Sequence, residues 1–197
     1  KSVLSYYGIS DVTKWNDDRD DLKQITPLNK RPSEILLGDN YTTEQALKAS
    51  PITYVNENTV PMLLMHGEND SLVEFQHSST MAAKLRENIG SENVETVFTK
   101  DDGHGVASIW GTPDKVKTAI NFLQKRHRPT VNLDSPENTR PASSWEDLNA
   151  YPNHYIGVKY ANQSNAQKMH IVLPENAGAE PTPLIIFVHG GGFLGCN

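Results

Sequence analysis

Hydrophobic positions along the chain form short continuous runs separated by longer amphipathic stretches. The runs at residues 2–7, 60–67 and 94–98 are rich in β-branched, aromatic and aliphatic side chains and have the length of strands. The run at 60–67 is almost entirely apolar, which is typical of a strand covered on both faces. The first of these strands is expected to end at Gly8.

Helical spacing of apolar residues occupies much of the sequence between these runs. The predicted helices cover residues 32–37, 42–49, 72–88 and 114–127, with stop signals at Gly38, Pro51 and Gly90. The last of them is expected to present Val116, Ala119, Ile120 and Leu123 on one apolar face. Strands that alternate with helices predict an α/β fold with a mostly parallel sheet.

The residue composition of the chain changes at Arg128, where a stretch of prolines interleaved with Ser, Asn and Asp begins. This change divides the chain into residues 1–127, a linker or extension at 128–153, and residues 154–197. Within the last part, stretches resembling a hairpin precede a final apolar run. The expected hairpin strands are residues 154–160 and 167–173, the final strand is 184–188, and residues 15–30 are expected to form a surface excursion.

Composition narrows the classes of partner. The 197 residues carry a net charge of −6, which argues against nucleic acid or an anionic membrane surface as a partner. The longest apolar run, at 184–188, is far too short to span a bilayer.

Cys196 is the only cysteine, so neither an intrachain disulfide nor a cysteine-based metal site is expected. The acidic stretch 17–21 lacks the spacing of a calcium loop, and no metal or cofactor is expected. The compartment, secreted or cytoplasmic, stays open.

Candidate catalytic residues follow two of the predicted strands. Asp70 lies in the sequence HGENDSLV directly after the strand at 60–67, and His104 lies in DDGHG after the strand at 94–98. The 34 residues from one to the other leave room for one helix and one strand. Open α/β sheets place their active sites at the carboxyl ends of neighbouring strands, so we expect Asp70 and His104 within hydrogen-bond reach.

A glycine-rich loop follows the apolar run at 184–188. His189 is succeeded by Gly190, Gly191 and Gly192, whose backbone N–H groups are unshielded by any Cβ. Such a loop can point its donors at an oxyanion.

These segments resemble the α/β-hydrolase fold, and within it the HGGG-type serine carboxylesterases, which include lipases, feruloyl esterases and acetyl-xylan esterases. Residues 48–55, 61–73 and 103–105 are similar to the C-terminal half of such enzymes. Residues 160–175 and 183–193 are similar to their N-terminal half.

The resemblance implies hydrolysis of a small acyl or aryl ester, with plant polysaccharide esters among the candidates. It implies that Asp70 is the triad acid, that His104 is the base, and that Gly190, Gly191 and Gly192 form the oxyanion hole. Two alternatives stay open at this point: a serine peptidase of the same fold, and a non-catalytic hydrolase-like binding module.

Two departures from the family pattern change the interpretation. The acid and the histidine precede the HGGG loop instead of following it, and no Gly-x-Ser-x-Gly elbow occurs in the 197 residues. The nearest imitation, residues 8–12, lacks the closing glycine, so Ser10 is not expected to be the nucleophile. We interpret the chain as a rotated or tandem-derived piece that is inactive alone. A missing segment or a second chain is then expected to cover the inner edges of the strands at 2–7 and 184–188. The remaining histidines are expected to be structural, packing or surface residues: His66, His77, His127, His154, His170 and His189.

Overall fold

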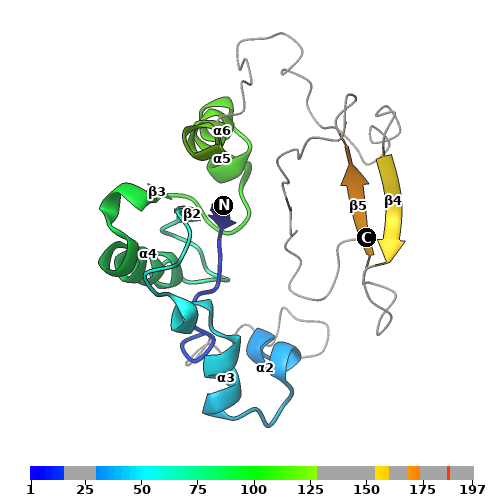
Figure 1. Cartoon of the computed structure of the whole chain (residues 1–197). Helices are drawn as coiled ribbons and strands as arrows, with labels where there is room; N and C mark the ends of the chain where they lie inside the picture. The colour runs from blue at the N-terminus through cyan, green and yellow to red at the C-terminus, as the bar shows by residue number, and fades with distance from the viewer. Residues whose placement is uncertain (16–29, 128–153, 160–167, 174–185, 187–197) are drawn as a thin grey trace. The chain divides into compact units, whose positions relative to one another are not determined.

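The computed structural model describes residues 1–15, 30–127, 154–159, 168–173 and 186 (Figure 1). They fall into two compact units, one within residues 1–127 and one within residues 154–186. The first unit contains a three-stranded sheet and the second a two-stranded sheet. The predicted surface excursion, the linker, and the HGGG loop with its strand lie outside the described residues, apart from the single residue Ile186 and the two ends of the excursion.

The sheet of the first unit is parallel and has the order β1-β2-β3. Its strands are β1 (Val3–Tyr6), β2 (Met62–Gly67) and β3 (Val94–Thr99). The central strand β2 is buried from its second residue to its last, which confirms the prediction of a strand covered on both faces. Its neighbours β1 and β3 flank it in matching register, so all three strands point their carboxyl ends to the same edge.

Local sequence signals explain where the helices begin and end. Pro32 occupies the first turn of its helix, where its missing N–H costs nothing. Thr42 and Gln45 form a reciprocal capping box. Gly90, at φ 82°, ends the long helix of the unit. The helices are α2 (Pro32–Leu37), α3 (Thr43–Ala49), α4 (Gln76–Ile89), α5 (Ala107–Trp110) and α6 (Pro113–His127), with 3₁₀ turns η1 (Pro51–Tyr54) and η2 (Ser91–Asn93).

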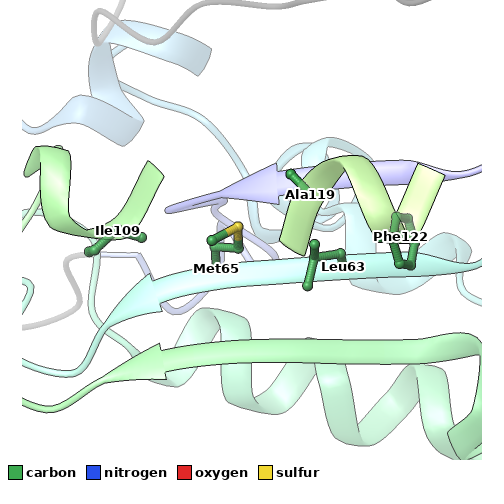
Figure 2. Close-up of a cluster of buried hydrophobic side chains, with 5 residues drawn as sticks. All are labelled: Leu63, Met65, Ile109, Ala119 and Phe122. Carbon is green, nitrogen blue, oxygen red and sulfur yellow. The ribbon is translucent and has the colours of Figure 1, made fainter. Parts of the chain in front are cut away.

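One face of the sheet packs against α5 and α6. Figure 2 shows that the odd-numbered residues of β2 meet side chains from both helices. Complete burial of such a side chain stabilises the fold by about 1.5–3 kcal/mol. This core therefore anchors β2 and, through it, the loop at its carboxyl end. The cluster consists of Leu63, Met65, Ile109, Ala119 and Phe122.

The opposite face of the sheet packs against α4. Leu64 points to this side and contacts Met81, Ala82 and Leu85 of the helix. The alternation of Leu63 and Leu64 between two cores follows from the two-residue period of a strand. His66, two residues after Leu64, therefore faces the first turns of α4.

Two sequence predictions need correction in this unit. The helix predicted at 72–88 begins only at Gln76, because the backbone N–H groups of Leu72 and Val73 are held by the Asp70 side chain in a turn. On α6, Val116 is exposed, whereas Phe122 is the buried aromatic of that face. Within the described part of the chain, no helix is both long and apolar enough to cross a bilayer.

The second unit contains the predicted hairpin. Its antiparallel strands are β4 (His154–Lys159) and β5 (Lys168–Val172), and the register shifts between Tyr155 and Val158. Gly157, at φ 70°, lies at this irregularity, where a side chain would be strained. The antiparallel pairing expected of the two hairpin strands is confirmed over the described residues.

Candidate active site

Two loops lie together at the carboxyl ends of β2 and β3. The acid loop comprises residues 67–73 and the histidine loop comprises residues 100–106. Because the parallel strands end at the same level, the loops leave the sheet side by side. One backbone hydrogen bond of 3.1 Å joins them, from the Asn69 N–H group to the Asp102 carbonyl oxygen, and the Glu68 N–H group donates at 2.8 Å to the carbonyl oxygen of Thr99 at the end of β3.

The Asp70 carboxylate is fully enclosed and receives four hydrogen bonds. The backbone N–H groups of Leu72 and Val73 each donate to Oδ1 at 2.9 Å. His104 Nδ1 lies 2.8 Å from Oδ2, and His66 Nε2 lies 3.1 Å from the same oxygen. Burial by itself would raise the pKa of Asp70, but these four bonds outweigh it and hold the pKa well below its usual range. Asp70 is therefore a carboxylate at neutral pH.

His104 is the more exposed partner of this pair. Its side chain is 33% exposed, and its Nδ1 bonds the buried Asp70 oxygen. Gly103 precedes it and Gly105 follows it at φ 69°, so the backbone on both sides tolerates rotation. None of the described residues hydrogen-bonds Nε2 of His104. This nitrogen is thus available to exchange a proton with a reacting group.

His66 is a second histidine at the acid. Its side chain is fully buried, and Nε2 lies 2.9 Å from the carbonyl oxygen of Val73 as well as 3.1 Å from Asp70. Its other nitrogen, Nδ1, lies 2.6 Å from the Ser78 hydroxyl of α4. The sequence predicted a structural histidine that bonds backbone, which is confirmed; its bond to Asp70 was missed. The sequence signal for that bond was the four-residue spacing of His66 and Asp70 across the tight turn that follows β2.

Tyr7 completes the surroundings of His104 and was not predicted. It follows β1 at φ 53°, a left-handed conformation that costs a non-glycine residue about 1–2 kcal/mol. Its ring centroid lies 5.0 Å from that of His104, and its hydroxyl donates to the Val106 carbonyl at 3.1 Å. Burial first, and the nearby carboxylate of Asp70 second, raise the pKa of Tyr7 to about 12. The phenol therefore stays a hydrogen-bond donor at neutral pH.

Gly67 is required by the close approach of the two loops. A Cβ at this position would overlap the backbone carbonyl oxygen of Asp102. Only glycine lets the end of β2 pass this close to the histidine loop. The motif His66-Gly67 thus serves both the acid and the contact between the loops.

The structure brings together two of the five predicted site residues. Asp70 and His104 lie within hydrogen-bond reach, as expected from their strands. The three predicted oxyanion-hole residues, Gly190, Gly191 and Gly192, lie outside the described residues. The Ser10 hydroxyl is buried and donates to the His77 carbonyl at 2.8 Å, a structural role that agrees with its exclusion as nucleophile. In the described ranges, no group of three or more His, Cys, Asp or Glu side chains is arranged to hold a metal ion.

Comparisons with known proteins place this geometry in context. The family model described as BD-FAE matches residues 1–85, which include His66 and Asp70 and stop before His104. "Uncharacterized peptidase YtmA" of Bacillus subtilis is 30% identical over 88 residues, covering 44% of this chain and 32% of that protein. "Probable carboxylic ester hydrolase LipM" of Mycobacterium tuberculosis is 28% identical over 87 residues, covering 44% of this chain and 20% of that protein.

The chain has the expected α/β fold with a parallel sheet flanked by helices, and its similarity is to proteins named as hydrolases. It spans about a third and a fifth of the length of the two curated relatives. Among solved structures, the acylaminoacyl peptidase of Pyrococcus horikoshii is 23% identical, with a TM-score of 0.47 over 68% of this chain and 22% of that one. One of these two relatives is named as a peptidase and the other as a carboxylic ester hydrolase. In the first unit, the sheet edge that bears Asp70 and His104 is the candidate active site.

Proposed function

We propose that the chain supplies the acid and the base of a serine-dependent carboxylic ester hydrolase. The supporting observation is the 2.8 Å contact between Asp70 Oδ2 and His104 Nδ1 at the carboxyl ends of adjacent parallel strands. The carboxylate is buried and ionised, while the histidine is partly exposed with Nε2 directed to no described residue. This is the division of roles that a triad requires.

In the proposed reaction, Asp70 fixes His104 in one orientation and stabilises the imidazolium that forms. His104 Nε2 takes the proton of a serine hydroxyl as that oxygen attacks the ester carbonyl, and then returns it to the leaving alcohol. The N–H groups of Gly190, Gly191 and Gly192 are the proposed donors to the tetrahedral oxyanion. One such donor typically lowers the free-energy barrier of the reaction by about 3–4 kcal/mol.

The serine itself is proposed to come from outside the 197 residues. No Gly-x-Ser-x-Gly elbow is present in them, and Ser10 is committed to a buried structural bond. A further segment of a longer protein, or a second chain, would then complete both the sheet and the triad. The 197-residue chain alone is accordingly expected to lack serine-dependent turnover.

The proposed substrates are small acyl or aryl esters, including esters of plant polysaccharides. The name of the LipM relative supports ester hydrolysis, whereas the polysaccharide esters rest on the resemblance of the sequence motifs. The name of the YtmA relative favours a second candidate, hydrolysis of a peptide or acylated amino acid by the same triad. The two candidates differ in the leaving group that His104 protonates, an alcohol or an amine.

The test uses a protein that joins this chain to a segment with an elbow serine. We expect it to hydrolyse p-nitrophenyl acetate, with kcat reduced by about 10³-fold or more in His104→Ala and in Asp70→Asn. Asp39→Asn, an exposed carboxylate paired with Lys30, is the matched control and should retain full activity. Preference for an acylated amino-acid p-nitroanilide would favour the peptidase.

Two results would overturn the proposal. One is ester turnover that survives His104→Ala, which would remove the base from the mechanism. The other is the absence of both turnover and labelling of the elbow serine by a fluorophosphonate, which would favour a binding module.

A further inference from the structure

The buried side of the acid loop carries a second hydrogen-bonded chain that the proposed triad does not use. It runs from Ser78 on α4 through His66 on β2 to Asp70. Ser78 is 1% exposed and His66 is 0% exposed, so water does not compete for these contacts. The chain reaches Asp70 Oδ2, the same oxygen that His104 contacts.

The hydrogen-bond partners determine where the protons lie. The Val73 carbonyl and the Asp70 carboxylate can only accept, so His66 Nε2 must carry a hydrogen. Among the described residues, the Ser78 hydroxyl contacts one acceptor, His66 Nδ1, at 2.6 Å. A buried hydroxyl donates where it can, so Ser78 donates to Nδ1. His66 is therefore a neutral imidazole with its proton on Nε2.

A neutral ring at this position has a consequence for Asp70. A cationic His66 would form an ion pair with the carboxylate and reduce the negative charge that faces His104. A neutral donor instead orients Oδ2 and leaves the full charge for the exposed histidine. Ser78 thus acts through His66 by fixing both its ring orientation and its protonation state, as outer partners do for the histidines of metal sites.

We propose that His66 and Ser78 are positioning residues that hold the Asp70 carboxylate, as an uncompensated anion, toward His104. This inference rests on the proposed function, since it assigns these residues a part in preparing the triad acid. It extends that function from the two residues of the acid–base pair to a four-membered chain, Ser78–His66–Asp70–His104. The chain crosses from the packed helix α4 to the solvent-facing histidine loop.

Two substitutions of His66 separate positioning from packing. In His66→Gln, the amide nitrogen of the longer side chain can take the place of Nε2 and still donate to Asp70. In His66→Asn, the shorter amide falls at the level of Nδ1 and leaves Asp70 Oδ2 without this donor. Both variants keep a buried amide and both lose the ring, so their difference reports the donor position.

The readout on the chain itself is ¹H–¹⁵N nuclear magnetic resonance of the imidazole groups. In the wild type we expect His66 as the Nε2–H tautomer and a downfield Nδ1–H signal from His104, bonded to Asp70. His66→Gln should keep that His104 signal, and His66→Asn should lose it or shift it upfield. Ser78→Ala should populate the second tautomer of His66, whereas Ser79→Ala, at the neighbouring partly exposed serine, should not.

Activity of the elbow-containing protein gives the second readout. We expect His66→Asn to lower kcat about tenfold or more with KM unchanged, and His66→Gln to recover most of the loss. His77→Gln, at a buried histidine that does not contact Asp70, is the control and should retain full activity.

The two readouts separate the inference from the function on which it rests. An Nδ1–H tautomer of His66 in the wild type, or a His104 signal equally retained in the Asn and Gln variants, would overturn the inference. An inactive elbow-containing protein with the predicted resonances would instead overturn the proposed function alone.

Discussion

In the acid loop, the Asp70 carboxylate receives four hydrogen bonds and its side chain is excluded from solvent, whereas in the histidine loop a third of the His104 side chain is exposed. The acid loop follows the central strand, whose residues are packed on both faces. The histidine loop follows the edge strand β3 and carries a glycine on either side of His104. The two loops thus differ in burial, in hydrogen bonding and in backbone freedom.

This difference matches what acid–base chemistry asks of each residue. The acid must hold its carboxylate in one orientation, and fixed hydrogen-bond donors achieve this. Burial of the carboxylate costs desolvation energy in return. The base must approach a nucleophile and exchange protons, which requires access and some rotation. The two side chains are joined by a hydrogen bond of 2.8 Å, so the enclosed carboxylate orients the partly exposed imidazole.

The largest expected effect comes from removing the acid. Asp70→Ala leaves the buried N–H groups of Leu72 and Val73 without acceptors, at about 1–3 kcal/mol for each unsatisfied group. Asp70→Asn keeps an oxygen that can accept both bonds, so its loss of unfolding free energy should be smaller by about 2 kcal/mol. Urea unfolding of the two variants measures the difference. Equal losses would mean that the carboxylate does not organise the acid loop.

The next effect tests the contact between the loops. Gly67→Ala places a methyl group against the Asp102 carbonyl, and relief of that overlap should cost about 1–3 kcal/mol and move the histidine loop. Gly103→Ala is the matched control in the same region, because its nearest neighbour would lie at an ordinary 3.8 Å. We expect the downfield His104 signal to be lost in the first variant and kept in the second. Its retention in both would show that the loops are positioned independently.

The third prediction concerns pH and isolates the charge of the acid. The folded-state pKa of Asp70 is depressed. The ionised carboxylate therefore makes its full contribution to folding stability above the unfolded-state pKa of about 4, and this contribution is lost as the pH falls toward the folded-state pKa. Below pH 4, the free energy of unfolding of the wild type should fall by up to about 1.4 kcal/mol per pH unit more than that of Asp70→Asn. Urea titrations between pH 3 and 7 compare the two. Parallel curves would contradict an ionised, hydrogen-bonded Asp70.

The sequence was sufficient to predict the proximity of Asp70 and His104 because parallel strands bring their carboxyl ends to one edge. Two apolar runs, each followed by a polar loop, therefore predicted the proximity of Asp70 and His104 without any knowledge of side-chain geometry. The central position of β2 was equally legible, since its run is apolar at almost every residue. The pairing of the strands at 154–159 and 168–172 also agrees with the hairpin expected from the sequence.

The surroundings of the pair were less accessible to sequence reasoning. The late start of α4 depends on Asp70 capturing two backbone N–H groups, which a helical pattern of apolar residues does not record. The partnership of His66 with Ser78 depends on how α4 lies across β2. Tyr7 adopts a positive φ that its residue type disfavours, so only the fold reveals it. Local patterns thus identified the two candidate catalytic residues, and tertiary packing supplied the residues that hold them.

Tyr7 also gives the smallest expected effect and the finest test of the contrast between the loops. Its hydroxyl bonds the Val106 carbonyl at a partly exposed position, so Tyr7→Phe should cost only about 0.5–1 kcal/mol. The ring that lies beside His104 is kept in this variant, and the acid loop is untouched. Amide hydrogen exchange should therefore accelerate in the histidine loop, at residues 103–106, and stay unchanged in residues 67–73. Tyr54→Phe, which removes a similar exposed hydroxyl bond to the Lys48 carbonyl, is the control and should leave both loops unaffected. Equal acceleration in both loops would contradict this contrast. Loss of one weak bond at the edge of the histidine loop would then loosen the acid loop as well, although four hydrogen bonds hold the Asp70 carboxylate there.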